Sequence, residues 1–197
     1  MKKAIRDEYA EKGVEAFYKA HADVYENPHF PYIKSLLEQN QPRIDYSKVL
    51  DFCSGGGEVT LILRGLLGEH FNNENILGTD PFTAKLYRRN TNCACLPYNF
   101  EDVIKGRLTK KLGYNPAEEP IFTAIICSFA MHLCPEKQLY PLVSQLFLLS
   151  KNIIIITPHK RPQLEELTGV QLTFEDFVLT EKGKKVFLKN YSLVHGA

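Results

Sequence analysis

An acid and a run of glycines form the motif in this sequence that is best suited to chemistry. Asp51 lies in a short apolar run, and Cys53, Ser54 and the triplet Gly55-Gly-Gly57 follow it. Glycine leaves room for a ligand to approach the backbone. A leucine-rich stretch begins at Glu58. The motif therefore predicts a ligand-binding turn between a strand and a helix, and the alternative is a tight turn without a ligand.

Further polar residues follow the later apolar runs. Asp80 ends the second run, and Glu101 and Asp102 come after a weak third run. Ser128 and His132 come after the fourth. In an open parallel sheet the carboxyl ends of the strands share one edge, where ligands bind. Each residue also has a structural alternative, because the acids favour helix starts and a lone histidine at such a junction is often structural.

Strand-like and helix-like segments alternate along the chain, which predicts an open parallel sheet with helices on both faces. The predicted strands are 48–53, 75–79, 92–96, 121–127 and 152–156. The predicted helices between them are 58–67, 81–90, 101–112 and 135–149. The C-terminal part differs, since 174–180 and 185–192 are typical of two strands joined as a hairpin.

The N-terminal segment is predicted to hold two helices. Residues 3–26 carry apolar and aromatic side chains at helical spacing, Tyr18 and Tyr25 among them, and Pro28 ends the pattern. A second helix is expected over 32–39. The aromatic face is expected to pack on the sheet helices.

Other nucleotide-binding motifs do not match the glycine-rich turn. The dinucleotide fingerprint G-x-G-x-x-G, started at Gly55, fails at its third glycine, where Thr60 stands. The phosphate loop G-x-x-x-x-G-K-[ST] is missing from the sequence, and no Tyr-x-x-x-Lys pair follows the fourth predicted strand. A dehydrogenase and a phosphate-loop enzyme are therefore disfavoured.

The same residues resemble one known family. Val49-Leu-Asp-Phe-Cys-Ser-Gly-Gly-Gly57 is similar to the first motif of class I S-adenosylmethionine-dependent methyltransferases, with Cys53 in place of the first glycine. Ile126-Cys-Ser-Phe-Ala-Met-His-Leu133 resembles the family's segment after the fourth strand. The resemblance implies an α/β three-layer sandwich with a seven-stranded, mostly parallel sheet of order 3-2-1-4-5-7-6, in which strand 7 is antiparallel.

The resemblance also implies the domain organisation and the activity. Residues 1–197 would form a single methyltransferase domain, with an N-terminal helical lid over 1–47 and a Rossmann-like core over 48–197. The cofactor would be S-adenosylmethionine, the product S-adenosylhomocysteine, and the acceptor a small molecule, protein or RNA. The alternative is an inactive fold that binds a nucleoside or a partner protein.

Roles for individual residues follow from the resemblance. Asp51 would contact the ammonium of the methionine tail, Asp80 the ribose hydroxyls, and Glu101 or Asp102 the adenine amino group. His132 would face the acceptor as a base or positioning group. The expected cofactor-binding residues are Asp51, Phe52, Cys53, Ser54, Gly55, Gly57, Asp80, Pro81, Phe82, Phe100, Glu101, Ser128 and Phe129. The expected lid residues are Tyr18, Tyr25 and His29.

The composition limits location and partners. Lysine and arginine total 24 against 23 acids, so RNA binding rests only on the basic segments 105–111 and 157–162. The longest apolar run, 152–157, is too short for a membrane, and the N-terminus lacks a signal-peptide core. The five cysteines show no metal-ligand spacing. The expectation is a soluble, cytoplasmic or nuclear protein without a metal.

Overall fold

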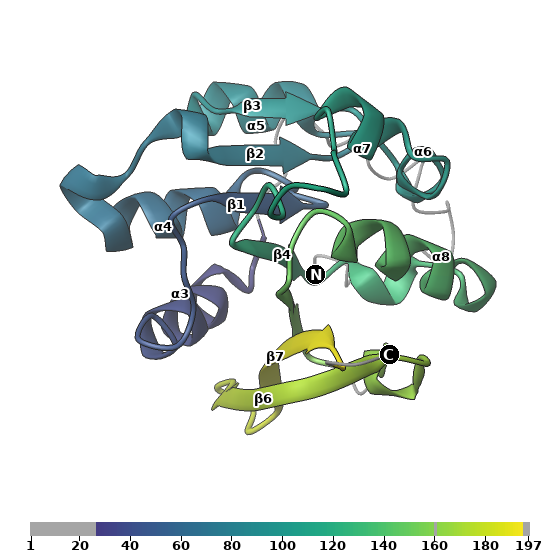
Figure 1. The fold of residues 1–197 in the computed structure, drawn as a ribbon. Coiled ribbons are helices and arrows are strands. Elements are labelled where there is room, and N and C mark those ends of the chain that lie inside the picture. The colour runs from purple at the N-terminus through teal and green to yellow at the C-terminus, as the bar shows by residue number, and fades with distance from the viewer. Residues whose placement is uncertain (1–26, 160, 195–197) are drawn as a thin grey trace.

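The computed structural model describes residues 27–159 and 161–194, which build one seven-stranded sheet with helices on both faces. Its strands are β1 (Val49–Phe52), β2 (Ile76–Thr79), β3 (Ala94–Leu96), β4 (Ala124–Ser128), β5 (Ile153–Thr157), β6 (Val170–Leu179) and β7 (Lys185–Leu193). They lie in the order β3-β2-β1-β4-β5-β7-β6 (Figure 1). β7 pairs antiparallel with both β5 and β6, and the other neighbours are parallel. The predicted topology is confirmed.

Helices cover both faces of this sheet. They are α3 (Phe30–Gln39), α4 (Glu58–Leu67), α5 (Ala84–Thr91), α6 (Phe100–Ile104), α7 (Arg107–Lys111) and α8 (Glu136–Phe147). Short 3-10 turns are η1 (Gly68–His70), η2 (Asn73–Asn75), η3 (Met131–Leu133) and η4 (Leu164–Glu166). The buried residues of α3, α4 and α5 share one core with the sheet, and those of α6, α7 and α8 share another. The three-layer prediction is therefore confirmed.

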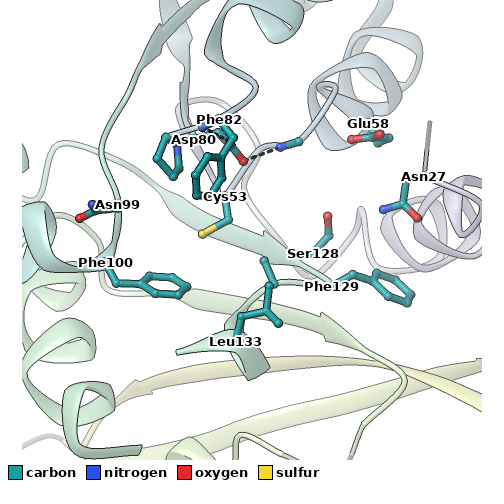
Figure 2. A pocket seen from close by; sticks show the side chains of 13 residues that line it. Asn27, Cys53, Glu58, Asp80, Phe82, Asn99, Phe100, Ser128, Phe129 and Leu133 are labelled. Carbon is teal, nitrogen blue, oxygen red and sulfur yellow. Dashed lines mark hydrogen bonds between the residues drawn. The ribbon is translucent and has the colours of Figure 1, made fainter. Parts of the chain in front are cut away.

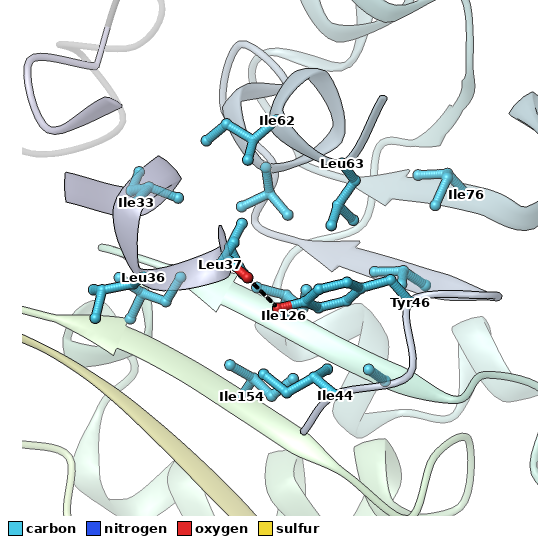
Figure 3. Close-up of a cluster of buried hydrophobic side chains, with 14 of the residues drawn as sticks. Ile33, Leu36, Leu37, Ile44, Tyr46, Ile62, Leu63, Ile76, Ile126 and Ile154 are labelled. Carbon is cyan, nitrogen blue, oxygen red and sulfur yellow. Dashed lines mark hydrogen bonds between the residues drawn. The ribbon is translucent and has the colours of Figure 1, made fainter. Parts of the chain in front are cut away.

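The first core fixes α3 and α4 over the middle of the sheet (Figure 3). Leu37 and Leu63 from these helices are fully buried, as are Ile126 and Ile154 from β4 and β5. Full burial of one such side chain stabilises the fold by about 1.5–3 kcal/mol. The Tyr46 hydroxyl donates a hydrogen bond of 3.1 Å to the Leu37 carbonyl and so connects α3 to the segment that precedes β1.

Some predicted boundaries need correction. The helix predicted over 101–112 is two helices, because Gly106 adopts φ 71°, a left-handed conformation that interrupts the helix. The strand predicted over 121–127 starts at Ala124, and the hairpin strand predicted from 174 starts at Val170. The helix predicted over 32–39 starts earlier, at Phe30. Apart from the split helix, these corrections only move the ends of elements, and the order of the strands is unchanged.

The helix predicted over 3–26, with Tyr18 and Tyr25, lies outside the described residues. Among the residues that the structure covers, no helix has the length and apolarity needed to cross a membrane.

Candidate active site

A cavity opens where β1, β2 and β4 end (Figure 2). It lies at the edge of the sheet where the sequence predicts a ligand. The residues that line it are Asn27, Cys53, Gly55, Glu58, Asp80, Pro81, Phe82, Asn99, Phe100, Ser128, Phe129, Ala130 and Leu133. The predicted cofactor-binding residues absent from this lining are Asp51, Phe52, Ser54, Gly57 and Glu101.

Three residues of the loop after β1, Cys53, Gly55 and Gly57, have positive φ angles. Gly57 has φ 97°, and a Cβ added there would lie 2.3 Å from the Thr91 Cγ2 atom of α5. Only glycine fits this position, so Gly57 lets α5 approach the loop. Cys53 has φ 57°, which is costly for a residue with a side chain. This conformation explains why the resembled motif has a glycine at the place of Cys53.

The Cys53 thiol is not a reactive nucleophile. A hydrogen bond with the Cys127 thiol and, after it, burial raise the pKa of Cys53 well above its usual value. The thiol form therefore persists at neutral pH, and the nucleophilic thiolate is disfavoured. Cys53 contributes a small half-buried surface to the cavity.

Asp51 points away from the cavity, into the layer between β1 and α4. Its Oδ2 atom accepts hydrogen bonds from the Thr60 hydroxyl at 2.8 Å and the Thr60 backbone N–H at 3.3 Å. The Tyr87 hydroxyl lies 2.6 Å from that of Thr60 and extends the buried network. Burial raises the pKa of Asp51 well above its usual value, and Glu58 and Asp80 raise it further. Thr60, the residue that breaks the dinucleotide fingerprint, thus anchors the motif acid.

Three of the predicted residues, Phe52, Ser54 and Gly57, lie next to residues of the cavity lining but do not line the cavity. Phe52 points to the opposite face of the sheet, where its ring packs 6.0 Å from that of Phe100. Ser54 is buried, and its backbone N–H donates to the Thr79 carbonyl. These residues of the predicted set position the loop and do not line the cavity.

Asp80 holds the loops on both sides of the cavity. Its Oδ1 atom accepts the backbone N–H groups of Phe82 and Thr83, each at 2.8 Å. Its Oδ2 atom accepts the Gly55 N–H at 3.2 Å (Figure 2). Both roles predicted for this acid remain compatible, because it caps the turn after β2 and still lines the cavity.

The apolar end of the cavity is built by the segments after β2 and β3. Phe82 and Phe100 line it, together with Asn99. Glu101 lies away from the cavity, because its side chain is 62% exposed and pairs with Lys105 at 2.7 Å. The acid predicted to face the adenine amino group therefore points to solvent.

Asp102, the other predicted candidate for the adenine amino group, is engaged in capping α6. Its backbone N–H donates to the Asn99 side chain, and its Oδ2 atom accepts the Asn99 backbone N–H. Its Oδ1 atom pairs with Arg107 at 2.6 Å. Asp102 therefore belongs to a capping box, the structural alternative for this position.

Stacked rings border the cavity after β4. Phe129 has φ 55°, and its N–H donates to the Ile156 carbonyl at 2.8 Å. Its ring stacks on that of His29 with 4.3 Å between centroids and 8° between planes. Strained non-glycine residues of this kind concentrate at functional sites. The arrangement places His29, a predicted lid residue, against the cavity lining.

His132 lies beside the cavity rather than on it. Its neighbours Met131 and Leu133 point inward, whereas His132 is exposed and its ring lies 4.5 Å from that of His159. Burial of part of the ring and the nearby His159 lower the pKa of His132 to about 4. The imidazole is therefore neutral at pH 7 and is a weak base.

This low pKa predicts a pH dependence of stability. Between pH 6.5 and 4, the unfolded chain binds a proton at His132 that the folded protein does not bind, so the free energy of unfolding falls as the pH is lowered. We expect the His132→Gln variant to lose this part of the decrease. Denaturant unfolding of the wild type and the variant at pH 7 and pH 5 measures the fall in the free energy of unfolding. An equal decrease in both proteins would contradict the low pKa.

Two polar residues of the cavity are missed by sequence reasoning. Glu58 is 8% exposed and lines the cavity from the first position of α4, and Asn27 faces the same region. Asn99 also lines the cavity, whereas the sequence pointed to its neighbours Glu101 and Asp102. An acid at Glu58 is expected for any helix start, so its type gives no separate signal of a site.

Sequence comparisons identify a relative without a described activity. No protein-family model matches the chain. An uncharacterized protein of Schizosaccharomyces pombe is 28% identical over 202 residues, which cover 84% of this chain and 79% of the relative.

Solved structures match nearly the whole chain. A protein solved in a study of the conversion of a disulfide bond into a thioacetal group during echinomycin biosynthesis has a TM-score of 0.64 at 16% identity, covering 93% of this chain and 94% of its own. Magnesium protoporphyrin IX methyltransferase from Synechocystis, with bound SAM, has a TM-score of 0.57 at 12% identity, and the match covers 95% of both chains. Mitomycin 7-O-methyltransferase MmcR has a TM-score of 0.57 at 13% identity, and the match covers 95% of this chain and 59% of the MmcR chain. The chain therefore has the fold of class I S-adenosylmethionine-dependent methyltransferases.

Proposed function

We propose that the chain is an S-adenosylmethionine-dependent methyltransferase whose cofactor occupies the cavity at the carboxyl edge of the sheet. One observation carries the proposal. Asp51, Glu58 and Asp80 are buried around the glycine-rich loop, and within residues 27–159 and 161–194 no basic side chain forms an ion pair with them. Because burial disfavours ionised acids that lack a counter-ion, a cationic ligand would stabilise their ionised forms. S-adenosylmethionine carries a sulfonium and an ammonium group.

The other end of the cavity suits an adenosine. Phe82 and Phe100 offer apolar surfaces for the base, and the Asp80 carboxylate is near enough to the same end to accept ribose hydroxyls. We assign the contact with the edge of the adenine to the Asn99 side chain in place of Glu101, since Asn99 lines the cavity and Glu101 does not.

The same charges argue against a dinucleotide. A pyrophosphate needs backbone N–H groups and positive charge, as at the glycine-rich turn of dinucleotide-binding folds. Here the Gly55 N–H already donates to Asp80, and Glu58 stands at the start of α4. Two negative phosphates would face carboxylates without a described counter-ion.

The chain's own contribution to methyl transfer would be positioning and exclusion of water. When bound, S-adenosylmethionine supplies a methyl group on a positively charged sulfur. Ser128 and the ring of Phe129 border the cavity on the side of His29 and would orient the acceptor. We assign His132 no role as a general base, because an imidazole with a pKa of about 4 removes few protons from an acceptor at pH 7.

The acceptor class and the domain roles remain part of the proposal. Residues 48–197 would form the catalytic core and 1–47 the lid. In the basic segment 105–111, Lys105 and Arg107 already pair with Glu101 and Asp102, which leaves less free positive charge for RNA. The position of His132 off the cavity favours a second candidate, a binding module without activity.

A transfer assay separates the two candidates. The protein would be incubated with S-adenosylmethionine labelled in its methyl group and with small-molecule, protein and RNA fractions of a cell extract. We expect label in one fraction, lost with the Asp80→Ala variant. Cofactor binding without transfer to any fraction would favour the binding module.

A further inference from the structure

Glu58 is a buried acid on the cavity wall whose described partners are backbone N–H groups. It is the first residue of α4, its exposed fraction is 8%, and it lines the cavity beside Asn27 (Figure 2). The N–H groups of Glu58 itself, Asn27 and Gly56 favour its ionised form, but burial has the larger effect and raises its pKa. No ion pair of Glu58 occurs within the described ranges.

The other two acids of the loop are engaged elsewhere. The Oδ2 atom of Asp51 is held by Thr60, and the residue does not line the cavity. Asp80 accepts three backbone N–H groups and lies close to Phe82. Glu58 and Asp80, the two acids of the cavity lining, thus both accept only neutral backbone N–H groups, and Glu58 is the one that lies on the side of Asn27.

The position of Glu58 selects one end of the ligand. Figure 2 shows Glu58 and Asn27 on one side of the cavity, and Asn99 and Phe100 on the opposite side. S-adenosylmethionine has its adenine at one end and its α-ammonium and α-carboxylate at the other. With the base at Phe100, the amino-acid end faces Glu58.

On the basis of the proposed function, we infer that Glu58 binds the α-ammonium of the cofactor and is the residue that recognises its amino-acid end. This replaces Asp51, to which the sequence motif assigns the ammonium. The ammonium would supply the positive charge that Glu58 lacks among the described residues, and a charge-assisted hydrogen bond would form in a region largely shielded from water.

The same carboxylate connects the cofactor to the acceptor side. The Asn27 side chain accepts the His29 N–H at 2.9 Å, and the His29 ring stacks on Phe129. The Asn27 backbone N–H donates to the Glu58 carboxylate. An ammonium bound to Glu58 would therefore contact the same carboxylate as the segment that carries His29. Cofactor binding would therefore stabilise the position of His29 next to Phe129.

Two ligands that differ at the amino-acid end test this inference. S-adenosylhomocysteine has the α-ammonium, whereas 5′-methylthioadenosine keeps the adenosine and the sulfur but lacks the amino acid. Calorimetric titration of both into the Glu58→Gln variant is expected to show affinity for S-adenosylhomocysteine reduced by about 10- to 100-fold, with 5′-methylthioadenosine changed less than about 2-fold. Glutamine keeps the size of the side chain and removes its charge.

Control variants identify the acid responsible. Glu101→Gln changes a solvent-exposed acid and is expected to leave both affinities unchanged. If Asp51→Asn selectively weakens S-adenosylhomocysteine and Glu58→Gln does not, the inference is overturned. An equal loss of both ligands in folded Glu58→Gln overturns it as well, because the residue would then support the whole site. If Glu58→Gln does not fold, the test uses Glu58→Asp. The ratio of the affinities for S-adenosylhomocysteine and its N-acetyl derivative is then compared between Glu58→Asp and the wild type. Equal ratios in the two proteins overturn the inference.

The failure of the proposed function gives a different result. Wild-type protein would then bind neither S-adenosylhomocysteine nor 5′-methylthioadenosine. If the wild type binds both ligands equally, the proposed adenosine site stands and the role of Glu58 is overturned.

Discussion

The Gly57→Ala variant is expected to lose about 2–5 kcal/mol of unfolding free energy, enough to unfold much of a protein of ordinary stability. Two effects add at this position. The backbone has φ 97°, which disfavours any residue with a Cβ atom, and that atom would lie 2.3 Å from the Thr91 side chain. Both Thr91 and Tyr87 next to it are fully buried, so the neighbours have little room to move. Denaturant unfolding measures the loss.

Two control variants separate the backbone effect from the contact with Thr91. Gly113 has φ 69°, but a Cβ there meets nothing within 4 Å, so Gly113→Ala should cost only about 1–2 kcal/mol. Thr91→Ser removes the Cγ2 atom and keeps the hydroxyl that donates to the Tyr87 carbonyl. It should restore part of the stability of Gly57→Ala in a double-mutant cycle. Equal costs for Gly57→Ala and Gly113→Ala would contradict the close packing of α5 on the loop.

The Asp80→Ala variant is expected to bind S-adenosylhomocysteine at least about 100-fold more weakly than the wild type. The substitution would remove the acceptor for the ribose hydroxyls. It also leaves the N–H groups of Gly55, Phe82 and Thr83 without their carboxylate acceptor, so the loops around the cavity lose a common anchor. Calorimetric titration measures the affinity, and a thermal melt shows whether the variant is folded.

A milder substitution and a distant acid complete this test. Asp80→Asn keeps one oxygen for the N–H groups of Phe82 and Thr83 and removes the charge, so we expect an intermediate loss of about 10-fold. Glu119→Gln alters an exposed carboxylate that pairs with Lys151 and does not line the cavity, so it should leave the affinity unchanged. Wild-type affinity in folded Asp80→Ala would refute the ribose contact.

The order of the sheet could be predicted because its strands are continuous apolar runs separated by clear turn residues. Ile153–Thr157 is buried along its whole length, as a strand covered on both faces must be. The break at Gly106 was missed, because a glycine within a periodic segment is compatible with one helix as well as two. The seventh strand was predicted from the hairpin together with the family resemblance.

The edge of the sheet that carries the site was predictable, whereas the directions of its side chains were not. Asp80 and Ser128 follow strand ends, and the parallel topology alone brings them to one edge. Asp51 lies within β1, where successive side chains point to opposite faces, and it faces α4 rather than the cavity. Glu101 and Asn99 are two residues apart, and only the path of the chain into α6 decides which one faces the cavity.

Calorimetric titration of the purified wild-type protein with S-adenosylmethionine, S-adenosylhomocysteine and NAD tests the central claim most directly. The buried acids around the glycine-rich loop predict that the first two ligands bind, each at one site per chain, and that NAD does not. Binding of NAD, or of none of the three, would contradict the assignment of this cavity to S-adenosylmethionine.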